Sequence, residues 1–488
     1  MSAFLGLDIG TSSVKAVVVD ADDRVLAQAS ESLNVQRPMA LWSEQDPKAW
    51  WIATVRTVRQ LPESVRRTVQ SVGLAGQMHG AVLLDERDVP LRPAILWNDG
   101  RSARECLELE RREPRMREIT GNMAMPGFTA PKLLWVRAHE PEIFKRTRTV
   151  LLPKDYVRLC LTGEKVSDPS DASGTLWLDV ARREWSEAML EACGLTRQHM
   201  PEIVEGSMSS GLLTDEAASL LGIPSCVVAG GGGDNAASAV GSGVVAPGQG
   251  FLSLGTSGVI FTVADRLLAN PARAVHAFCH CLPKRWHQMA VMLSAASSLT
   301  WAVKMMGYSN ITHAVSRAKE RQPRRDAPIF LPYLAGERTP HNDPYARGVF
   351  FGITLETRRA DLIGAVLEGV AFGLADGLDA LQEAGSSPSA LDVCGGASRF
   401  DYWCELLAST LNRTLVRRIG AEVGAAAGAA RLGRLVLSGE EPSVVCRAPP
   451  IERVFEPNPH SAAWLSERRA VFSKLYRNVK DLFKDSQP

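Results

Sequence analysis

The 488-residue sequence has no long hydrophobic run, and this absence argues against a membrane-spanning protein. Its longest apolar stretches, such as "AVVV" and "SCVVAG", are the size of a strand and fall well short of a membrane span. The N-terminus also lacks the charged start, apolar stretch and cleavage site of a signal peptide. We therefore expect a chain that neither crosses a membrane nor is exported.

The sequence also has no large excess of positive or negative charge, and its cysteines show no regular spacing. The formal net charge is +1, so no overall field directs the chain toward nucleic acid or an anionic membrane. The nine cysteines are scattered and do not have the spacing of a disulfide framework. An odd, dispersed set fits a reducing compartment, so we expect a cytoplasmic protein with neither nucleic-acid nor membrane partners.

The sequence does contain an internal repeat. The phrase "GLDIGTSSVKAVVVD" at residues 6–20 returns as "SLGTSGVIFTVAD" at residues 253–265, so Gly10 aligns with Gly255 at an offset of 245. This offset is close to half the chain length, and the flanking pattern of each copy is apolar, turn, then β-rich. We predict two homologous halves, each opening with a β-hairpin. The predicted limits are 1–245 and 246–440, followed by a C-terminal extension, 441–488, that ends in an exposed helix.

Strand and helix signals alternate within both halves. Residues 14–20, 24–30, 71–76 and 94–99 read as strands, and residues 46–69 read as a helix capped by Asp46 and interrupted near Pro62. In the second half, residues 359–384 read as a long helix, and "LDVCGG" reads as a strand and a turn. Alternating strands and helices predict a layered α/β architecture.

The two Gly-Thr-Ser turns are candidates for phosphate binding, because the amides of such a turn point the same way and can surround phosphate oxygens. A plain hairpin turn is the alternative for either copy alone, but two copies in register favour a clamp for a nucleotide. Asp8 would repel bound phosphates unless a cation such as Mg²⁺ lies between them, and one cation site leaves the second copy free to carry Ser253. Lys15 is either a charge for a transferring phosphoryl group or a solvated strand lysine.

Two glycine-rich turns complete the set. In "SCVVAGGGGDNAAS" (225–238), Asp234 is either an ordinary helix cap or a general base that takes a proton from an attacking hydroxyl. In "LDVCGGASRF" (391–400), Gly395 and Gly396 either allow a flat ring to lie against the backbone or simply make a tight turn. Neither run is followed by Gly-Lys-Ser/Thr, and no G-x-G-x-x-G opens the first strand–helix unit, so two common nucleotide motifs are excluded.

A cluster of histidines and cysteines at residues 275–287, "VHAFCHCLPKRWH", invites a metal-site interpretation. It lacks the two paired spacings of a zinc finger, so packing of a strand and hairpin is the favoured interpretation. The residues concerned are His276, Cys279, His280, Cys281 and His287. The basic run "KERQPRRD" (319–326) has no interleaved aromatic residues, and we expect a solvated loop there.

The motifs "DIGTSS", "GQMHG", "GGGDNA", "SLGTSG" and "GGAS", taken together, resemble those of the FGGY carbohydrate kinases over roughly residues 4–435. The segments "GFTAPKLLW" (127–135) and "GVFFGITLETRRADLIGAVLEG" (348–369) fit that family's two signatures. The resemblance implies an α/β fold of two duplicated ribonuclease H-like domains, as in actin, Hsp70 and hexokinase, with ATP and sugar in the cleft between them.

The resemblance also implies residue roles. Asp8 would orient Mg·ATP, Asp234 would be the catalytic base, and Met78, His79 and Asn235 would contact the sugar. Met78 as core filler is the alternative for that residue. Glycerol kinases carry an Arg-Glu pair where this chain has Met78 and His79, which argues against glycerol. The phosphate- and nucleotide-binding candidates are Gly10, Thr11, Ser12, Ser13, Lys15, Gly255, Thr256, Gly395, Gly396 and Ala397.

One departure from the family lies at Phe400, where relatives often carry a small polar residue close to the nucleotide. The expected reaction is ATP-dependent phosphorylation of a sugar hydroxyl. The alternatives are the same chemistry on another ketose or polyol, and a sugar-binding regulator or actin-like ATPase without transferase activity. The expected partners are ATP, Mg²⁺ and a small-molecule sugar, and the sequence leaves a homodimer open.

Overall fold

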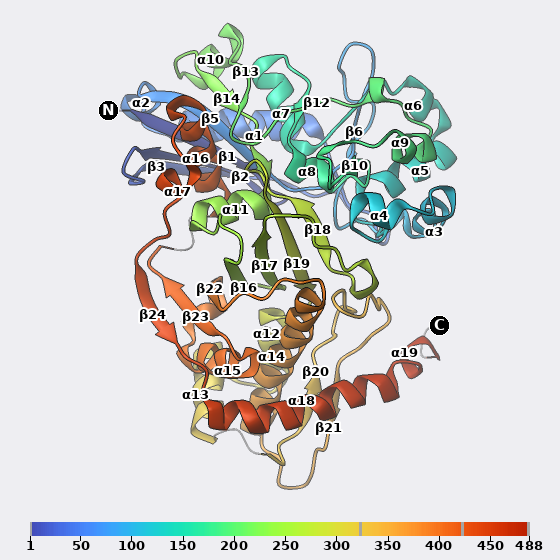
Figure 1. Ribbon diagram of the computed structural model, residues 1–488, viewed down its shortest axis with the longest axis vertical. Helices are drawn as coiled ribbons and strands as arrows, with labels where there is room; N and C mark the ends of the chain where they lie inside the picture. The colour runs from blue at the N-terminus through green and yellow to red at the C-terminus, as the bar shows by residue number, and fades with distance from the viewer. Residues whose placement is uncertain (1, 322–324, 421–423, 486–488) are drawn as a thin grey trace.

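A computed structural model describes residues 2–321, 325–420 and 424–485, and it has two lobes stacked along the long axis (Figure 1). Each lobe contains one seven-stranded sheet. In the first sheet the order is β13 (Ser209–Leu212), β14 (Val227–Ala229), β5 (Val69–Gly76), β1 (Ala3–Ile9), β2 (Ser13–Asp20) and β3 (Val25–Ser32), with β15 (Gly232–Gly233) also paired to β5. In the second sheet the order is β18 (His276–Cys279), β19 (Trp286–Met292), β17 (Gly258–Ala264), β16 (Gly250–Leu254), β22 (Ala390–Cys394), β23 (Thr414–Arg418) and β24 (Ile451–Phe455).

The two sheets share one topology around their central strands. Strand β1 pairs antiparallel with β2 and parallel with β5, and strand β16 pairs antiparallel with β17 and parallel with β22. The predicted hairpin at the start of each half is therefore confirmed. Because the carboxyl ends of parallel neighbours meet at one edge of a sheet, the turn after β1 lies beside the end of β5, and the turn after β16 lies beside the end of β22.

The helices predicted from local signals at residues 46–69 and 359–384 are present. Helix α1 (Pro47–Gln60) begins at Asp46, whose side chain accepts a hydrogen bond from Lys48 N, and Pro62 separates it from α2 (Glu63–Arg66). The long helix of the second lobe is α14 (Arg359–Glu383). Around these lie α7 (Pro153–Thr162), α8 (Pro169–Ser173), α10 (Asp215–Leu221), α12 (Ala296–Met305), α13 (Ile311–Arg321) and α15 (Asp401–Leu411). The strand expected at 94–99 is shorter, because β7 covers only Ala94–Ile95.

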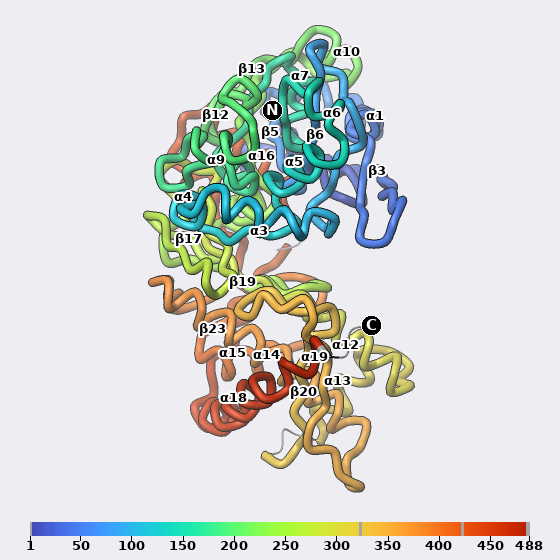
Figure 2. Tube along the Cα trace, turned by 90° about the vertical axis from the view of Figure 1, so that its right-hand side faces the viewer, coloured from blue at the N-terminus to red at the C-terminus, as the bar shows by residue number. Residues whose placement is uncertain are grey.

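Helix α16 (Gly424–Ser438) lies in sequence between β23 and β24 of the second sheet but packs against β1, β5 and α11 (Asp234–Ser242) of the first lobe. Figures 1 and 2 show it, near the red end of the colour scale, among the blue and green elements. The approach requires glycine: a Cβ on Gly6 would lie 1.8 Å from Ala426 O, and one on Gly73 would lie 1.7 Å from Ala429 O. The predicted limit at residue 440 places α16 in the second half, and these domain limits stay a prediction.

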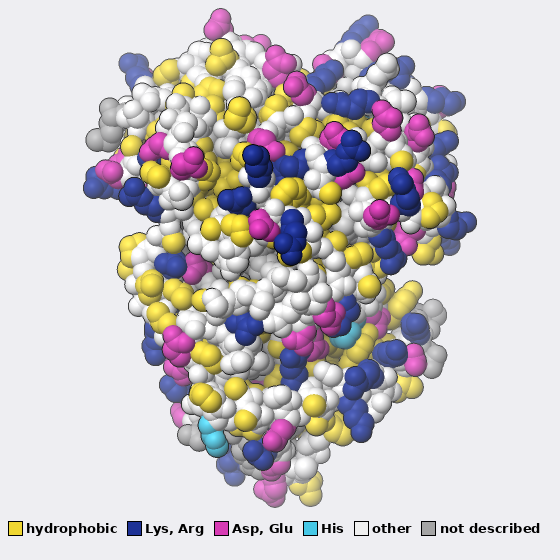
Figure 3. All heavy atoms as spheres, viewed as in Figure 1, with side chains coloured by type: hydrophobic (Ala, Val, Ile, Leu, Met, Phe, Trp, Pro, Cys, Tyr) yellow, Lys and Arg dark blue, Asp and Glu magenta, His cyan; other side chains and the backbone are white. Residues whose placement is uncertain are grey.

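The lobes also meet through β18. Ala277 exchanges two hydrogen bonds with the side chain of Asn122, and Cys279 N donates to Ser173 Oγ over 3.0 Å. Figure 3 shows the outline narrowing between the lobes, with cationic and anionic side chains mixed over this face. Within the described parts of the chain, no helix has the length and apolar character needed to cross a membrane.

The C-terminal helix differs from the expectation. Helix α18 (Pro459–Val479) is not simply exposed, because it buries Leu465, Phe472 and Leu475 against the hydrophobic core of the second lobe. Its Arg468 also forms an ion pair of 2.6 Å with Glu368 of α14. The amphipathic spacing of these residues explains the burial. Of the basic run 319–326, residues 322–324 lie outside the described residues.

Candidate active site

The first Gly-Thr-Ser turn joins β1 to β2 and is closed by a hydrogen bond of 3.0 Å from Gly10 N to Ser13 O. Ser12 is exposed at its tip, and Thr11 is held from the side. The Thr11 hydroxyl donates to Gln77 Oε1 over 2.8 Å and accepts from Trp97 Nε1 over 2.9 Å. The turn is therefore fixed by side chains from two other segments, which suits a rigid anion-binding loop.

Asp8 and Asp234 form a pair of neighbouring acids. Asp8 lies on β1, and Asp234 is the first residue of α11, directly after β15. Burial raises the pKa of Asp234 to about 6, and hydrogen bonds from Asn235 N and Nδ2 to Asp234 Oδ1 oppose that rise. Burial raises the pKa of Asp8 to about 7, and the nearby charge of Asp234 raises it further.

The carboxylate of Asp8 is suited to bind a cation. Its Oδ1 is buried and accepts no hydrogen bond from any described residue. Lys15, opposite Asp8 in the register of β1 and β2, partly compensates by lowering the pKa of Asp8. A buried carboxylate without a hydrogen-bond donor, beside a second carboxylate, is the chemistry that a divalent cation satisfies. The residues present therefore fit Mg²⁺.

Lys15 and Asp8 line one cavity of about 430 Å³. Strand β3 forms one wall of this cavity, and residues 424–426 at the start of α16 form another. The Lys15 side chain is exposed, so the two sequence interpretations are both compatible with its position. The cavity gives the carboxyl and ammonium groups a shared, partly enclosed space.

Met78 and His79 follow β5 and reach the start of α11. Met78 is buried, and a Cβ on Gly233 would lie 2.9 Å from its Sδ. His79 Nδ1 lies 2.7 Å from Gly174 O, and burial lowers the pKa of His79 to about 3. A carbonyl only accepts, so Nδ1 carries the proton and Nε2 is left as an acceptor for a hydroxyl. Met78 therefore lies between His79 and the residue directly before Asp234, because both Met78 and His79 contact Gly174 and Met78 also contacts Gly233.

The second Gly-Thr-Ser turn lies in the other lobe and faces the start of α12. Gly255 N donates to Ser257 O over 3.1 Å, so this turn closes one residue earlier than the first turn, in which Gly10 N donates to Ser13 O. Gly255 O and Thr256 O accept from the backbone N–H groups of Ala296 and Ala295, each over 3.0 Å. The carbonyls therefore face the helix, and the exposed side of the turn stays open.

The turn after β22 requires glycine at one position. Gly395 has φ of +89°, and a Cβ there would lie 2.7 Å from Leu254 O. A Cβ on Gly396 would meet no atom within 4 Å, and both glycines line a cavity of about 400 Å³. Ala397 is buried behind them. Phe400 packs against the second core and beneath the guanidinium of Arg399, 4.9 Å from the ring centroid.

Two protein-family models match successive parts of this chain. The model of the N-terminal domain of the FGGY family of carbohydrate kinases matches residues 3–241, and the model of the C-terminal domain matches residues 250–435. The chain belongs to the FGGY family of carbohydrate kinases. This assignment confirms the resemblance drawn from the motifs and the α/β fold of two related lobes, and kinases of this family use ATP.

The relatives of this FGGY kinase extend over its whole length. The xylulose kinase of Escherichia coli (strain K12) is 50% identical over 482 residues, 98% of this chain and 99% of the relative. The crystal structure titled "a xyloylose kinase from Brucella ovis" has a TM-score of 0.95 and 46% identity, covering 98% of this chain and 100% of that one. Plasmodium falciparum glycerol kinase with ADP, at 20% identity and a TM-score of 0.87 over 99% of this chain and 98% of that one, shares the fold.

Sequence reasoning missed the residues that hold the first turn of this kinase. Gln45 Nε2 donates to Thr11 O over 2.7 Å, and Gln45 Oε1 accepts from Gln77 Nε2 over 3.1 Å and from Trp50 Nε1 over 3.0 Å. Gln77 stands inside the quoted motif "GQMHG", so its polar side chain at the end of an apolar strand was the available signal. Gln45 and Trp97 stand in the segments "LWSEQDPKAWW" (41–51) and "RPAILWNDGR" (92–101), whose sequences do not show that the two side chains meet at Thr11.

A buried ionic cluster beneath the glycine-rich turn was also missed. Lys154 is fully buried and lies 2.5 Å from Asp155, 2.9 Å from Asp168 and 3.2 Å from Asp171. Ser170 Oγ donates to Asp168 and accepts from Gly233 N over 3.0 Å. The cluster therefore fixes the backbone immediately before Asp234.

The histidines and cysteines of residues 275–287 pack in the interior of the protein. His276, Cys279, His280, Cys281 and His287 are all buried, and no three or more His, Cys, Asp or Glu side chains among the described residues are grouped as ligands of a metal ion. Burial lowers the pKa of His280 to about 3, so that imidazole is neutral. His276 and Phe278 stack at 5.6 Å and line the contact between the lobes.

Proposed function

We propose that this kinase transfers the γ-phosphoryl group of ATP to the C5 hydroxyl of D-xylulose. The observation that carries the proposal is 50% identity over nearly the whole chain to a protein named xylulose kinase. The neutral His79 beside the apolar Met78 supports it, because together they offer one hydroxyl acceptor and one apolar wall.

Asp234 is the proposed general base. In the forward reaction the C5 oxygen forms a bond to the γ-phosphorus as the bond from phosphorus to the leaving oxygen of ADP breaks. Asp234 takes the hydroxyl proton, and its pKa of about 6 keeps it ionised yet basic near neutral pH. The hydrogen bonds from Asn235 fix one carboxylate oxygen and leave the other for the substrate.

The two turns and Asp8 are assigned to the phosphates. Gly10 to Ser13 and Lys15 from the first lobe, with Gly255 and Thr256 from the second, would contact them from opposite sides. Asp8 would hold Mg²⁺, directly or through water, and the ion would neutralise charge on the phosphate oxygens. Gly395, Gly396 and Ala397 would support adenosine.

Closure of the two lobes should exclude water from the transferring phosphoryl group. Because an open site admits water as the acceptor, we expect slow ATP hydrolysis in the absence of sugar. We further propose that the protein acts in the cytoplasm, which its nine free cysteines support. A homodimer stays open.

The test of the substrate is a coupled ADP-release assay across D-xylulose, D-ribulose, ketohexoses and glycerol. We expect the highest kcat/KM for D-xylulose. A higher value for another ketose or polyol would replace the substrate and keep the reaction, and ADP release that no sugar stimulates would favour a regulator or ATPase.

The test of the base is Asp234→Asn, with Asp215→Asn as the matched control. Asp215 is likewise the first residue of a helix, α10, but its side chain is exposed. Asp234→Asn should lower kcat by about 10²–10⁴-fold and still bind ATP, whereas Asp215→Asn should retain full turnover. Undiminished turnover in Asp234→Asn would remove this residue from the mechanism.

A further inference from the structure

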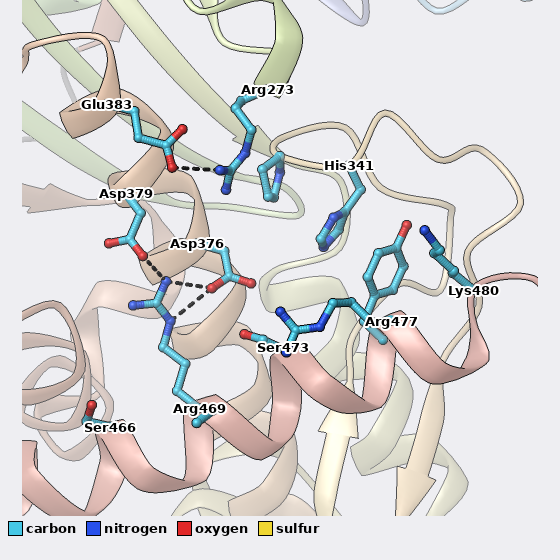
Figure 4. Close-up of a pocket in the computed structure, with 13 residues that line it drawn as sticks. Arg273, His341, Asp376, Asp379, Glu383, Ser466, Arg469, Ser473, Arg477 and Lys480 are labelled. Carbon is cyan, nitrogen blue, oxygen red and sulfur yellow. Dashed lines mark hydrogen bonds and ion pairs between the residues drawn. The ribbon is translucent and has the colours of Figure 1, made fainter.

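A cavity of about 570 Å³ lies in the second lobe, away from the two turns, between helices α14 and α18 (Figure 4). Four segments line it: α14, α18 with the residue after it, the chain at Arg273, and the chain at residues 340–341. Its volume is within the range of small-molecule sites. The proposed kinase reaction makes no use of it.

One wall of the cavity is acidic, and arginines neutralise it. Asp376 and Asp379 of α14 each lie 2.5 Å from Arg469 of α18, and Glu383 lies 2.6 Å from Arg273. These pairs set the orientation of the carboxylates, and each carboxylate keeps oxygen lone pairs that can accept hydroxyl hydrogens. The wall is therefore a fixed array of acceptors.

The opposite wall carries cations without ion-pair partners. Arg477 and Lys480, at the end of α18, are exposed and form no ion pair within residues 2–321, 325–420 and 424–485. Figure 4 shows the guanidinium groups of Arg273 and Arg477 on opposite sides of the space that His341 and Asp376 also face. Four cationic side chains thus face three carboxylates, which leaves an excess of positive charge for an anion.

His341 joins the two walls. Its ring stacks on Tyr476 at 3.8 Å, and its Nε2 lies 3.1 Å from the Tyr333 hydroxyl. Burial lowers the pKa of His341 to about 4, and the charges of Arg273 and Lys480 lower it further. The imidazole is therefore uncharged near neutral pH and adds no charge of its own to the cavity.

We propose that this cavity binds a phosphorylated sugar or polyol, with the phosphate between Arg477, Lys480 and Arg273 and the hydroxyls on Asp376 and Asp379. Guanidinium and ammonium groups are the usual partners of phosphate, and carboxylates are strong acceptors for sugar hydroxyls. A bare inorganic anion uses only the cationic side, so the acidic wall makes the site selective for an ester.

The cavity is connected to the contact between the lobes by a short segment. Thr339 N donates to Val291 O, and the Thr339 hydroxyl donates to Ala274 O over 2.8 Å, next to Arg273. Three residues before His341, Arg338 lies 3.4 Å from His276 Nε2. The His276 ring is 5.5 Å from Phe128, which in turn is 4.9 Å from His79. Occupation of the cavity would therefore act on the sugar side of the lobe contact, and this part of the proposal rests on the proposed function.

The test compares Arg477→Ala/Lys480→Ala with Lys474→Ala/Lys319→Ala. Both double variants lose two exposed cations, but Lys474 and Lys319 do not line the cavity. Titration calorimetry with D-ribose 5-phosphate, inorganic phosphate and D-ribose, at saturating ADP and D-xylulose, reads binding outside the active site. Ribose 5-phosphate should bind the wild type at least about tenfold more tightly than phosphate or ribose, and lose about tenfold or more in the cavity variant alone.

Kinetics form the second readout. Ribose 5-phosphate should change the KM for D-xylulose about twofold or more in the wild type and the control variant and leave it constant in the cavity variant. Equal binding of ester and inorganic phosphate, equal binding by both double variants, or no calorimetric signal would overturn the site. Binding without any change in KM or kcat would overturn the connection to the lobe contact. The calorimetric result does not depend on which sugar the kinase phosphorylates.

Discussion

Replacement of Asp8 by Asn should stabilise the folded protein while removing activity. In the folded state the pKa of Asp8 rises from an ordinary value of 3.8 to about 7, through burial and the charge of Asp234. Each pKa unit corresponds to about 1.4 kcal/mol, so ionised Asp8 lowers the free energy of unfolding by up to about 4 kcal/mol. Because its buried Oδ1 accepts no hydrogen bond from the described residues, the amide loses little there.

The pH dependence of the effect follows from the sign of the shift. The folded state binds the Asp8 proton more tightly than the unfolded state, so the wild type loses stability as pH rises from about 4 through 7. The advantage of Asp8→Asn should be small near pH 4, about 2 kcal/mol at pH 5 and about 4 kcal/mol at pH 8. Over 488 residues, 4 kcal/mol corresponds to a rise of roughly 4 °C in Tm.

The assay is scanning calorimetry at pH 5 and pH 8, with turnover measured on the same samples. Asp22→Asn is the control, because Asp22 lies in the same lobe with its side chain 71% exposed. The control should change stability by less than about 0.5 kcal/mol at both values, whereas Asp8→Asn should lose about 10²–10³-fold in kcat. A variant that is less stable than the wild type, or whose advantage is the same at pH 5 and pH 8, would refute the electrostatic reasoning.

Three further outcomes are expected. The kcat should fall about tenfold per pH unit below about pH 6, because protonated Asp234 cannot accept the hydroxyl proton, and His79, with a pKa of about 3, should add no second limb above pH 5; a pH–rate profile measures this. Gly73→Ala should lower the free energy of unfolding in urea by about 3 kcal/mol through its clash with α16, whereas Gly364→Ala, in α14 with open space around it, should be neutral or stabilising. Gln77→Leu should lower kcat about tenfold by releasing the Thr11 hydroxyl without raising the KM for sugar, and steady-state kinetics with each substrate varied separates the two.

Much of the fold could be predicted because its signals are local. The cap at Asp46, the break at Pro62 and the apolar runs on either side of each Gly-Thr-Ser turn all act within a few residues, and each predicted element is present. The internal repeat extended these local signals to the whole chain, because two copies of one hairpin imply two copies of one sheet.

The return of α16 to the first lobe could not be predicted from such signals. It depends on Gly6 and Gly73, far from α16 in sequence, which let the helix backbone approach two strands closely. The stretch "GAAAGAARLG" predicts a helix with a small-residue face, but not which surface that face will contact. Contacts of this kind depend on the shape of both the helix and the strands it contacts, whereas the hydrophobic periodicity of the helix gives no information about those strands.

The residues of the candidate site also fall into those that the sequence predicted and those that it did not. Asp8, Asp234, Met78 and His79 were named from motifs, and the acids lie close enough for the charge of Asp234 to raise the pKa of Asp8. Gln45 and Trp97, which hold Thr11, could not be assigned that role from the sequence, because any segment that crosses the end of β1 could supply a hydrogen bond there. The chemistry of a site is visible in its sequence, whereas the scaffold around it is visible only in three dimensions.

The divergence of the two repeats follows from the energetics of the acids. At the position of Asp8 the second copy has Ser253, which pairs in register with Cys394, directly before the glycine turn. The first copy already bears two carboxylates, each with a raised pKa. A third at position 253 would add repulsion against the phosphates that both turns are proposed to bind, and the proposed site has no second cation to balance it. The Ser253 hydroxyl keeps this position polar without adding a negative charge. The first half of the repeat therefore carries the two acids, and the second half carries the exposed glycine turn at Gly395 and Gly396.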